Sequence, residues 1–311
     1  MAPTLREFAV DTAFGRLSGL RGGASGAPRV LALHGWLDNA ASFVPLAAQL
    51  RGIELVALDL PGHGASAHLP PAADFTMVSA ARAAFATADA LGWDRFALLG
   101  HSLGGAIASV MAAAMPERIE RLALVEALGA LSQDEANTAK HLREAFAAYA
   151  LMAGKRLRVF PDVATAVRAR MQAHGGLGEA AARLLVERGI APVPASSDEA
   201  EGQQGGYVWR SDPRLTQPTA VRLSEAQVRD LIAGIGCPTR VLYAAPAQVY
   251  FPDDVRRQRA ALLAEGEVVV IPGGHHLHME DAAAVAAVFA DFLARRDPTA
   301  PAGAGSRDPE K

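Results

Sequence analysis

Short apolar runs rich in Val, Leu and Ala recur along the chain and are bounded by polar or turn-forming residues. Such runs are typical of buried strands, and helix-length stretches such as residues 75–92 lie between them. Alternating strands and helices predict a mostly parallel sheet covered by helices on both faces. With an antiparallel hairpin expected in the first 22 residues, the runs complete an eight-stranded sheet. They span residues 29–34, 54–59, 95–100, 121–126, 239–244 and 267–272.

The alternation is interrupted once, between residues 131 and 223, where the pattern indicates helices without strands. We therefore expect a helical cap inserted after the sixth strand. Residues 1–130 form the first part of the core, residues 131–223 the cap and residues 224–295 the second part of the core. The last residues, 296–311, are rich in Pro, Gly and charged side chains and are expected to form a disordered tail.

Composition narrows the class of protein. The 311 residues are 50% hydrophobic and carry a formal net charge of −3, so no basic surplus points to nucleic acid or an anionic membrane as a partner. Residues 96–116 contain no charged side chain, but the sequence GHSLGG interrupts them and favours a buried strand–turn–helix over a membrane span. The start of the chain lacks an apolar signal core and Cys237 is the single cysteine, so we expect a cytoplasmic protein.

One motif supplies a nucleophile. Ser102 is the centre of Gly100-His-Ser-Leu-Gly104, which follows an apolar strand and precedes a helix of small residues. This context is that of a nucleophile elbow, a tight strand-to-helix turn that strains the serine backbone. Gly100 and Gly104 are needed because neighbouring backbone passes too close for a Cβ. The N–H of Leu103, the residue after the nucleophile, is then expected to donate to an oxyanion.

Four motifs together make residues 5–295 resemble the α/β-hydrolase superfamily. These are LHGWLDNAASF after the third strand, LDLPGHGAS after the fourth, LLGHSLGG at the elbow and IPGGHHLHMED near the end. The sequences HGWLDNAASF, WRSDPRLTQP and RLSEAQV are further similar to the serine hydrolase-like (kraken-type) group. The resemblance fixes no substrate, because this fold hosts many chemistries.

The resemblance implies the base and the second oxyanion donor. The superfamily ends in a Gly-His-x-x-His-x-Glu pattern before the last helix, and this places the catalytic base at His275. His276 and His278 then line or brace the same loop. The second donor is implied to be the backbone N–H of Trp36, while His34 is expected to hold its loop by hydrogen bonds.

The triad acid is not where most of the superfamily has it. The loop after the strand at 239–244 reads AAPAQVYFP and contains no carboxylate. Glu126 ends the preceding buried strand, where some superfamily members, including haloalkane dehalogenases, carry the acid. A buried carboxylate needs a partner, and the carboxyl ends of parallel strands share one edge of the sheet, so we expect Glu126 to orient His275. Asp253 and Asp254, at the start of the next helix, are the alternative acids.

These residues predict a cofactor-free serine hydrolase that cleaves a small ester-like substrate through a Ser102–His275–Glu126 triad. A hydrolase of carbon–carbon bonds with the same triad, and a non-catalytic ligand-binding member of the fold, are the alternatives. The histidine-rich stretch at 275–278 is a possible metal site, but the sequence offers no matching carboxylate–His or Cys–His spacing, so no metal is expected.

Overall fold

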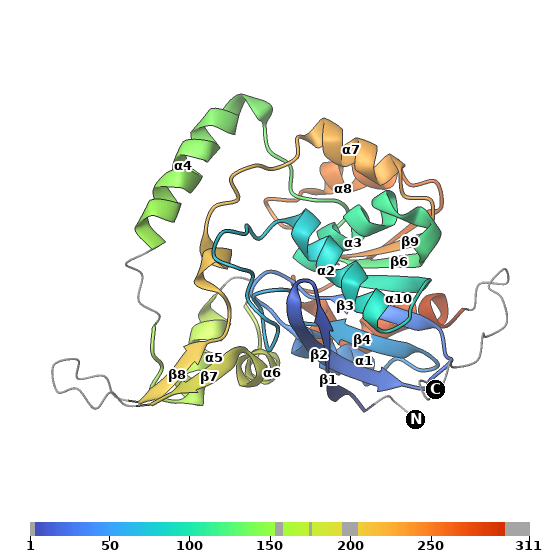
Figure 1. The fold of residues 1–311 in the computed structure, drawn as a ribbon. Helices are drawn as coiled ribbons and strands as arrows, with labels where there is room; N and C mark the ends of the chain where they lie inside the picture. Colours follow the sequence, from blue (N-terminus) through green and yellow to red (C-terminus); the bar gives the residue numbers. More distant parts are fainter. Residues whose placement is uncertain (1–3, 153–157, 174–175, 195–204, 296–311) are drawn as a thin grey trace, which may run out of the picture.

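The computed structural model describes residues 4–152, 158–173, 176–194 and 205–295. The tail predicted at 296–311 lies outside the described residues. One eight-stranded sheet runs through the centre in the order β1-β2-β4-β3-β5-β6-β9-β10 (Figure 1). The strands are β1 (Arg6–Thr12), β2 (Gly15–Gly23), β3 (Arg29–Leu33), β4 (Glu54–Leu58), β5 (Phe96–His101), β6 (Ile119–Val125), β9 (Thr239–Ala245) and β10 (Gly266–Pro272).

The pairing of the strands confirms the predicted fold class. Strands β1 and β2 form the expected antiparallel hairpin, and β2 also pairs antiparallel with β4. Every other neighbouring pair in this sheet is parallel. The carboxyl ends of the parallel strands therefore meet at one edge, which is where ligands bind in open α/β sheets.

Helices cover both faces of the sheet, and side chains alternate between the two layers because successive residues of a strand point to opposite faces. Leu31 and Leu33 pack with α2, α3 and α7 on one face, whereas Val30 and Ala32 pack with α1 and α10 on the other. The core helices are α1 (Val44–Ala47), α2 (Met77–Ala90), α3 (Leu103–Ala114), α7 (Glu225–Ala233), α8 (Asp253–Ala260), α9 (Leu277–Glu280) and α10 (Ala282–Ala294).

The segment between β6 and α7, which we call the cap (residues 131–223), contains α4 (Thr138–Leu151), α5 (Val163–Gln172) and α6 (Glu179–Gly189). It also contains β7 (Ile190–Val193) and β8 (Gly206–Trp209), an antiparallel pair that the sequence analysis did not predict. Four-residue strands are too short to show a period, so the prediction of helices without strands was wrong for these residues.

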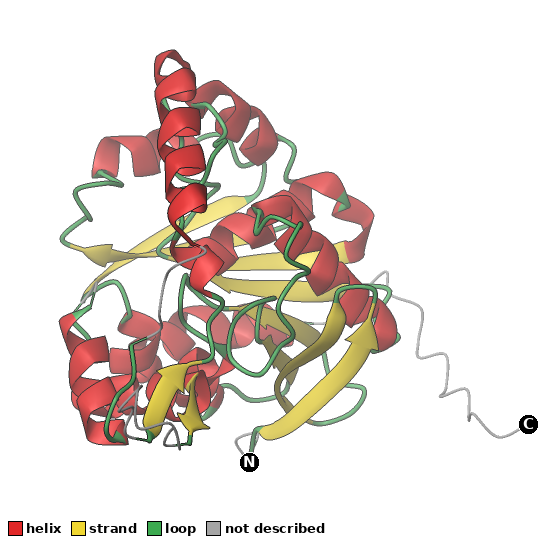
Figure 2. Ribbon diagram, turned by 60° about the vertical axis from the view of Figure 1, so that its left-hand side comes forward, coloured by secondary structure: helices red, strands yellow, loops and turns green. Residues whose placement is uncertain are grey.

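Two parts of the cap pack differently. Helices α5 and α6 share a small apolar core with Met279 of α9, so this part is joined to the main body. Helix α4 projects from the rest of the molecule in Figures 1 and 2, and Ala145 is its buried residue. Its Phe146 and Leu151 are exposed.

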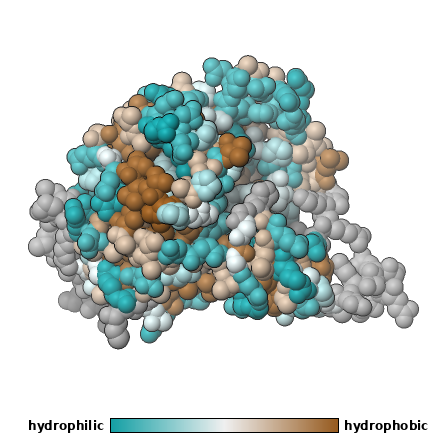
Figure 3. All heavy atoms as spheres, turned by 180° about the vertical axis from the view of Figure 1, so that it is seen from behind, coloured by the Kyte–Doolittle hydropathy of each residue, from teal (hydrophilic) through white to brown (hydrophobic). Residues whose placement is uncertain are grey.

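Seen from behind, hydrophilic and hydrophobic residues are mixed over the surface, and the largest hydrophobic area is compact (Figure 3). Edge strand β10 exposes Val268 and Val270. Among the described helices, none has both the length and the apolar character to cross a bilayer. The uncharged stretch at 96–116 is instead β5, a tight turn and α3, as the glycines within it predicted.

Candidate active site

Ser102 lies at the turn between β5 and α3 and has a strained backbone. Its φ of 51° and ψ of −114° lie outside the regions that non-glycine residues normally occupy. Strain of this kind persists only where the surroundings enforce it, and it concentrates at functional sites. The Ser102 N–H donates to the carbonyl of Val125 at 3.0 Å, which ties the turn to the end of β6. The elbow predicted from the sequence is therefore present.

The two glycines of the motif allow close packing of backbone against backbone. A Cβ on Gly100 would lie 2.5 Å from Gly105 Cα, and one on Gly104 would lie 1.9 Å from the carbonyl oxygen of Leu33. Neither contact is tolerated by a real side chain. The close approach of backbone that the sequence analysis expected at both glycines is therefore present.

The same contact places the candidate oxyanion donors in neighbouring segments. Leu103 is the first residue of α3, and Trp36 lies in the loop that follows β3, whose end packs against the start of α3. The Trp36 indole donates from Nε1 to the carbonyl of Leu215 at 2.8 Å, and its side chain is partly exposed. Trp36 thus joins the loop after β3 to the cap.

His34 braces this loop. Its Nδ1 donates to the carbonyl of Gly35 at 2.7 Å, and the N–H of Leu60 donates to its Nε2 at 3.0 Å. Burial lowers the pKa of His34, so the ring is neutral and each nitrogen is already engaged. This geometry agrees with the bracing role expected from the sequence.

His275 and Glu126 are in contact. His275 lies in the loop between β10 and α9, and its Nδ1 is 3.3 Å from Oε2 of Glu126 at the end of β6. The His275 side chain is 17% exposed, whereas that of Glu126 is 1% exposed. With Nδ1 directed at the carboxylate, Nε2 is the ring nitrogen left for proton transfer.

The Glu126 carboxylate has further partners besides His275. The N–H of Ala244 donates to Oε1 at 2.6 Å, and Nη2 of Arg256 lies 3.4 Å from Oε1 and 3.5 Å from Oε2. Glu126 also has a φ of 56°, a left-handed conformation that is strained for a residue with a Cβ. These contacts offset the cost of burying a carboxylate.

The alternative acids lie elsewhere. Asp253 and Asp254 are exposed in the first turn of α8, where carboxylates are favourable beside the N-terminus of a helix. The loop that lacks a carboxylate supplies Tyr250, whose hydroxyl is 3.4 Å from Nδ1 of His275. Sequence reasoning missed Tyr250 and Arg256. Tyr250 could have been found from its position in the loop before α8, where the triad acid is usually located. Nothing in the sequence around Arg256 indicated its contact with Glu126.

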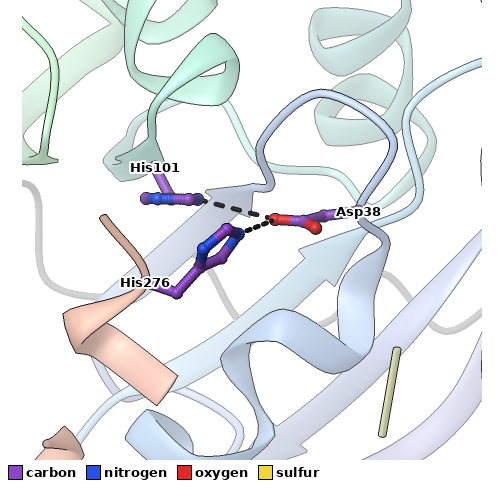
Figure 4. A group of neighbouring side chains, drawn as sticks. All are labelled: Asp38, His101 and His276. Atoms are coloured by element: carbon purple, nitrogen blue, oxygen red, sulfur yellow. Dashed lines mark ion pairs between the residues drawn. The ribbon is translucent and has the colours of Figure 1, made fainter. Parts of the chain in front are cut away.

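The other histidines of the loop are buried beside His101, which precedes the nucleophile. His278 Nε2 and the Ser42 hydroxyl are 2.6 Å apart, and burial lowers the pKa of His278 to about 3. His276 Nε2 and His101 Nδ1 face one carboxylate oxygen of Asp38 (Figure 4). The sequence predicted that His276 and His278 brace the loop, and both lie where they can do so.

Asp38, His101 and His276 are also the described residues whose arrangement best suits a metal ion. One ligand atom from each lies within 4.8 Å of the others, and all three residues are buried. The sequence analysis considered only His276 of this group, within the histidine-rich stretch, because Asp38 and His101 are far from that stretch along the chain.

A cavity of about 380 Å³ lies beside the site, at the junction of core and cap. Leu131, Arg222 and Tyr250 are among the residues that line it, while Ser102 and His275 are not. Tyr250 therefore both lines this cavity and contacts the ring of His275.

The model of the family described as alpha/beta hydrolase fold matches residues 28–282. The chain belongs to this family. A serine hydrolase-like protein of Dictyostelium discoideum is 29% identical over 274 residues, which cover 85% of this chain and 74% of that protein. The α/β-hydrolase assignment and the resemblance to serine hydrolase-like proteins are thus confirmed.

Solved structures agree with this α/β-hydrolase assignment. A hypothetical protein from Pseudomonas aeruginosa PAO1 is 39% identical with a TM-score of 0.85, covering 93% of this chain and 99% of that one. The thioesterase domain from the curacin biosynthetic pathway is 25% identical with a TM-score of 0.77 and the same coverage. These likenesses support hydrolase activity and leave the substrate open.

Proposed function

We propose that this α/β-hydrolase is a serine hydrolase that cleaves carboxylic esters or thioesters and needs no cofactor. The observation that carries the proposal is the contact between the buried Glu126 carboxylate and His275, at the same edge of the sheet as the strained Ser102. Nucleophile, base and acid then follow in the order of α/β-hydrolase triads.

In the proposed mechanism, Ser102 Oγ attacks the carbonyl carbon while Nε2 of His275 takes its proton. Glu126 fixes the tautomer of His275 through Nδ1 and stabilises the imidazolium that forms. The N–H groups of Leu103 and Trp36 donate to the oxyanion, and each such donor is typically worth about 2.7–4 kcal/mol in the transition state. His275 returns the proton to the leaving group. Water then attacks the acyl carbon while His275 takes its proton, and His275 gives this proton to Ser102 Oγ as the carboxylic acid leaves.

An apolar acyl group is among the substrates we propose, because α4 of the cap presents apolar side chains. Trp36 contacts Leu215, and Gln217 contacts Met152 at the end of α4, so one cap segment links Trp36 to that helix. Phe146 and Tyr149 lie on α4 with their ring centroids 6.0 Å apart, and both are exposed. Thioesters are included because the curacin thioesterase domain is a structural neighbour.

The test is labelling by a fluorophosphonate probe, followed by hydrolysis of p-nitrophenyl esters and acyl thioesters of graded chain length. Ser102→Ala should fold, as measured by circular dichroism, and lose both labelling and hydrolysis. Ser109→Ala removes a buried serine of the same helix that bonds to Gly105 and Gly129, and should keep both. Retained labelling in Ser102→Ala would refute the proposed nucleophile.

A further inference from the structure

Asp38 is a buried junction between four segments that surround the candidate site. It follows β3, and its side chain is 1% exposed. Nη2 of Arg170, from the last turn of α5 in the cap, donates to Oδ1. Oδ2 lies 3.3 Å from His276 Nε2 and 3.7 Å from His101 Nδ1 (Figure 4). One carboxylate thus touches the cap, the residue before Ser102 and the residue after His275.

The protons in this cluster can be placed. His101 Nε2 is 2.8 Å from the backbone carbonyl of His275, and a carbonyl only accepts, so Nε2 carries the hydrogen. Burial among other histidines lowers the pKa of His101 well below its ordinary value, so the ring is neutral and Nδ1 carries a lone pair. Burial raises the pKa of Asp38, but His276 and Arg170 outweigh it and hold this pKa below its usual range. Asp38 is therefore ionised, with Arg170 as its opposite charge.

Both atoms that face each other across this cluster lack a well-aligned donor. Among the described residues, neither Oδ2 of Asp38 nor Nδ1 of His101 has a hydrogen-bond partner. A Cβ on Gly35 would lie 2.9 Å from Nδ1 and 3.0 Å from Oδ2, so only glycine lets the loop after β3 close over them. The carboxylate is held in place chiefly by Arg170, a residue of the cap.

We infer that Arg170 is a positioning residue: through Asp38 it couples the seating of cap helix α5 to the placement of His275 and Ser102. The inference rests on the proposed function, because it assigns roles relative to that triad. His276 passes the constraint on, because its Nε2 lies 3.3 Å from Oδ2 of Asp38 and the residue directly follows His275. His101 Nε2–H holds the carbonyl of His275 from the other side. An error of about 1 Å in the placement of catalytic groups costs about 10²-fold in rate.

A divalent metal is the competing use of the same atoms. Separations of 3.3 and 3.7 Å from Oδ2 to the two ring nitrogens are close to those between the ligands of a tetrahedral ion. The guanidinium on Oδ1 already balances the carboxylate, however, and would repel a second cation at this depth. The observed charges therefore favour positioning over metal binding.

A second buried arginine provides the matched control. Arg188 of cap helix α6 binds Asp59 of the core through Nε and Nη2, at 3.0 and 2.7 Å. The Arg188 side chain is 8% exposed and that of Arg170 is 11% exposed, so both join the cap to the core from similar depth. Unlike Asp38, Asp59 does not face His276 or His101 in the ion pairs of the described residues.

The experiment compares Arg170→Gln with Arg188→Gln at equal folded fraction, in full pH profiles of kcat/KM on a short p-nitrophenyl ester. Arg170→Gln should lower kcat by about 10²-fold with little change in KM, because chemistry and not binding is displaced. The low-pH side of its kcat/KM profile, the acid limb, should move to higher pH. Without Arg170 the charge of Asp38 is uncompensated and favours protonated histidines nearby. Glu126, Tyr250, His101 and His276 also face His275 and stay unchanged.

Asp38→Asn should shift the acid limb in the opposite direction. It removes the negative charge, so the acid limb of this variant should move to lower pH while kcat also falls. Arg170→Lys keeps the charge and loses the fork of the guanidinium, so it should leave the limb in place and restore part of kcat. These two variants carry the test if Arg170→Gln does not fold. Arg188→Gln should lower stability without moving the limb.

Equal effects of Arg170→Gln and Arg188→Gln, with unmoved acid limbs, would overturn the inference. Both arginines would then only attach the cap to the core. Stoichiometric binding of Co²⁺ by the wild type, seen in its visible absorption and lost in Asp38→Asn, would also overturn it in favour of a metal site. An inactive Ser102→Ala beside a normal Arg170→Gln rejects only the inference. An active Ser102→Ala rejects the proposed function itself.

Discussion

Two buried carboxylates flank the candidate nucleophile, and each is held between an arginine and a histidine. On one side Glu126 contacts Arg256 and His275. On the other side Asp38 contacts Arg170 and His276, so neighbouring residues of one loop point to opposite carboxylates. The two clusters use the same three kinds of group, namely a carboxylate, a guanidinium and an imidazole.

They differ in where the arginine comes from. Arg256 belongs to α8 of the core and stacks on Tyr243 and Phe251, with its charge 4.4 and 5.7 Å from the two ring centroids. Arg170 belongs to the cap. The Glu126 cluster is therefore complete within the core sheet, whereas the Asp38 cluster is complete only when the cap is seated. The core can hold the His275–Glu126 pair by itself, and under the inference above the second cluster makes the placement of this pair depend on the cap.

The largest expected effect distinguishes the two histidines. His275→Gln removes the proposed base and should lower kcat by about 10⁴- to 10⁶-fold, as in serine proteases that lose a triad member. His276→Gln should cost about 10²-fold, because it only loosens the loop. Single-turnover acylation rates measure both. Equal losses would contradict the assignment of separate roles, and added chelator should leave the wild-type rate unchanged.

The next effect concerns the acid. Glu126→Gln keeps size and removes the charge that stabilises protonated His275, so turnover should fall by up to about 10⁴-fold. Asp253→Asn is the matched control, since this carboxylate is exposed in α8 and lies 3.8 Å from Arg256 Nη1. It should cost about 0.3–1 kcal/mol of helix-end stability and leave turnover unchanged. Steady-state kinetics measures the effect on turnover, and urea unfolding measures the effect on stability. A normal Glu126→Gln with a collapsed Asp253→Asn would return the acid to the later loop.

The smallest effect is on stability and concerns the histidines buried near Asp38 and its loop. Burial lowers the pKa of His63 and of His278 to about 3, whereas the unfolded chain has its ordinary value near 6.5. Between these values the unfolded state binds more protons, so the free energy of unfolding should fall as pH falls below about 6.5. Each such residue contributes up to about 1.4 kcal/mol per pH unit.

Urea unfolding at pH 7, 6 and 5 measures this slope. His278→Gln removes one of the titrating groups and should flatten the slope, even if it lowers stability overall. His68→Gln changes a half-exposed ring and should leave the slope as it is. An unchanged slope in His278→Gln would mean that another group carries the pH dependence.

Local sequence pattern determined a large part of the fold. The apolar runs located the six strands that follow the hairpin. In five of them burial on both faces leaves a continuous apolar signature within a few residues, whereas edge strand β10 is apolar although partly exposed. Gly100, Ser102 and Gly104 identified the elbow because they lie in one pentapeptide, although the backbone that requires glycine at position 104 is that of Leu33 in β3. Glu126 stood out because a carboxylate that ends a buried strand requires a partner.

The tertiary structure alone decided which partners these residues meet. Arg256 lies 130 residues from Glu126, and Arg170 lies 132 residues from Asp38. No local period encodes such distances, because an ion pair depends on where two elements dock and not on the pattern of either. The short strands β7 and β8 were missed for a related reason, because it is their pairing with each other that defines them and not a pattern within either. The sequence thus determined the chemistry at each strand end, and the docking of distant segments decided how these groups are oriented, charged and linked to the cap.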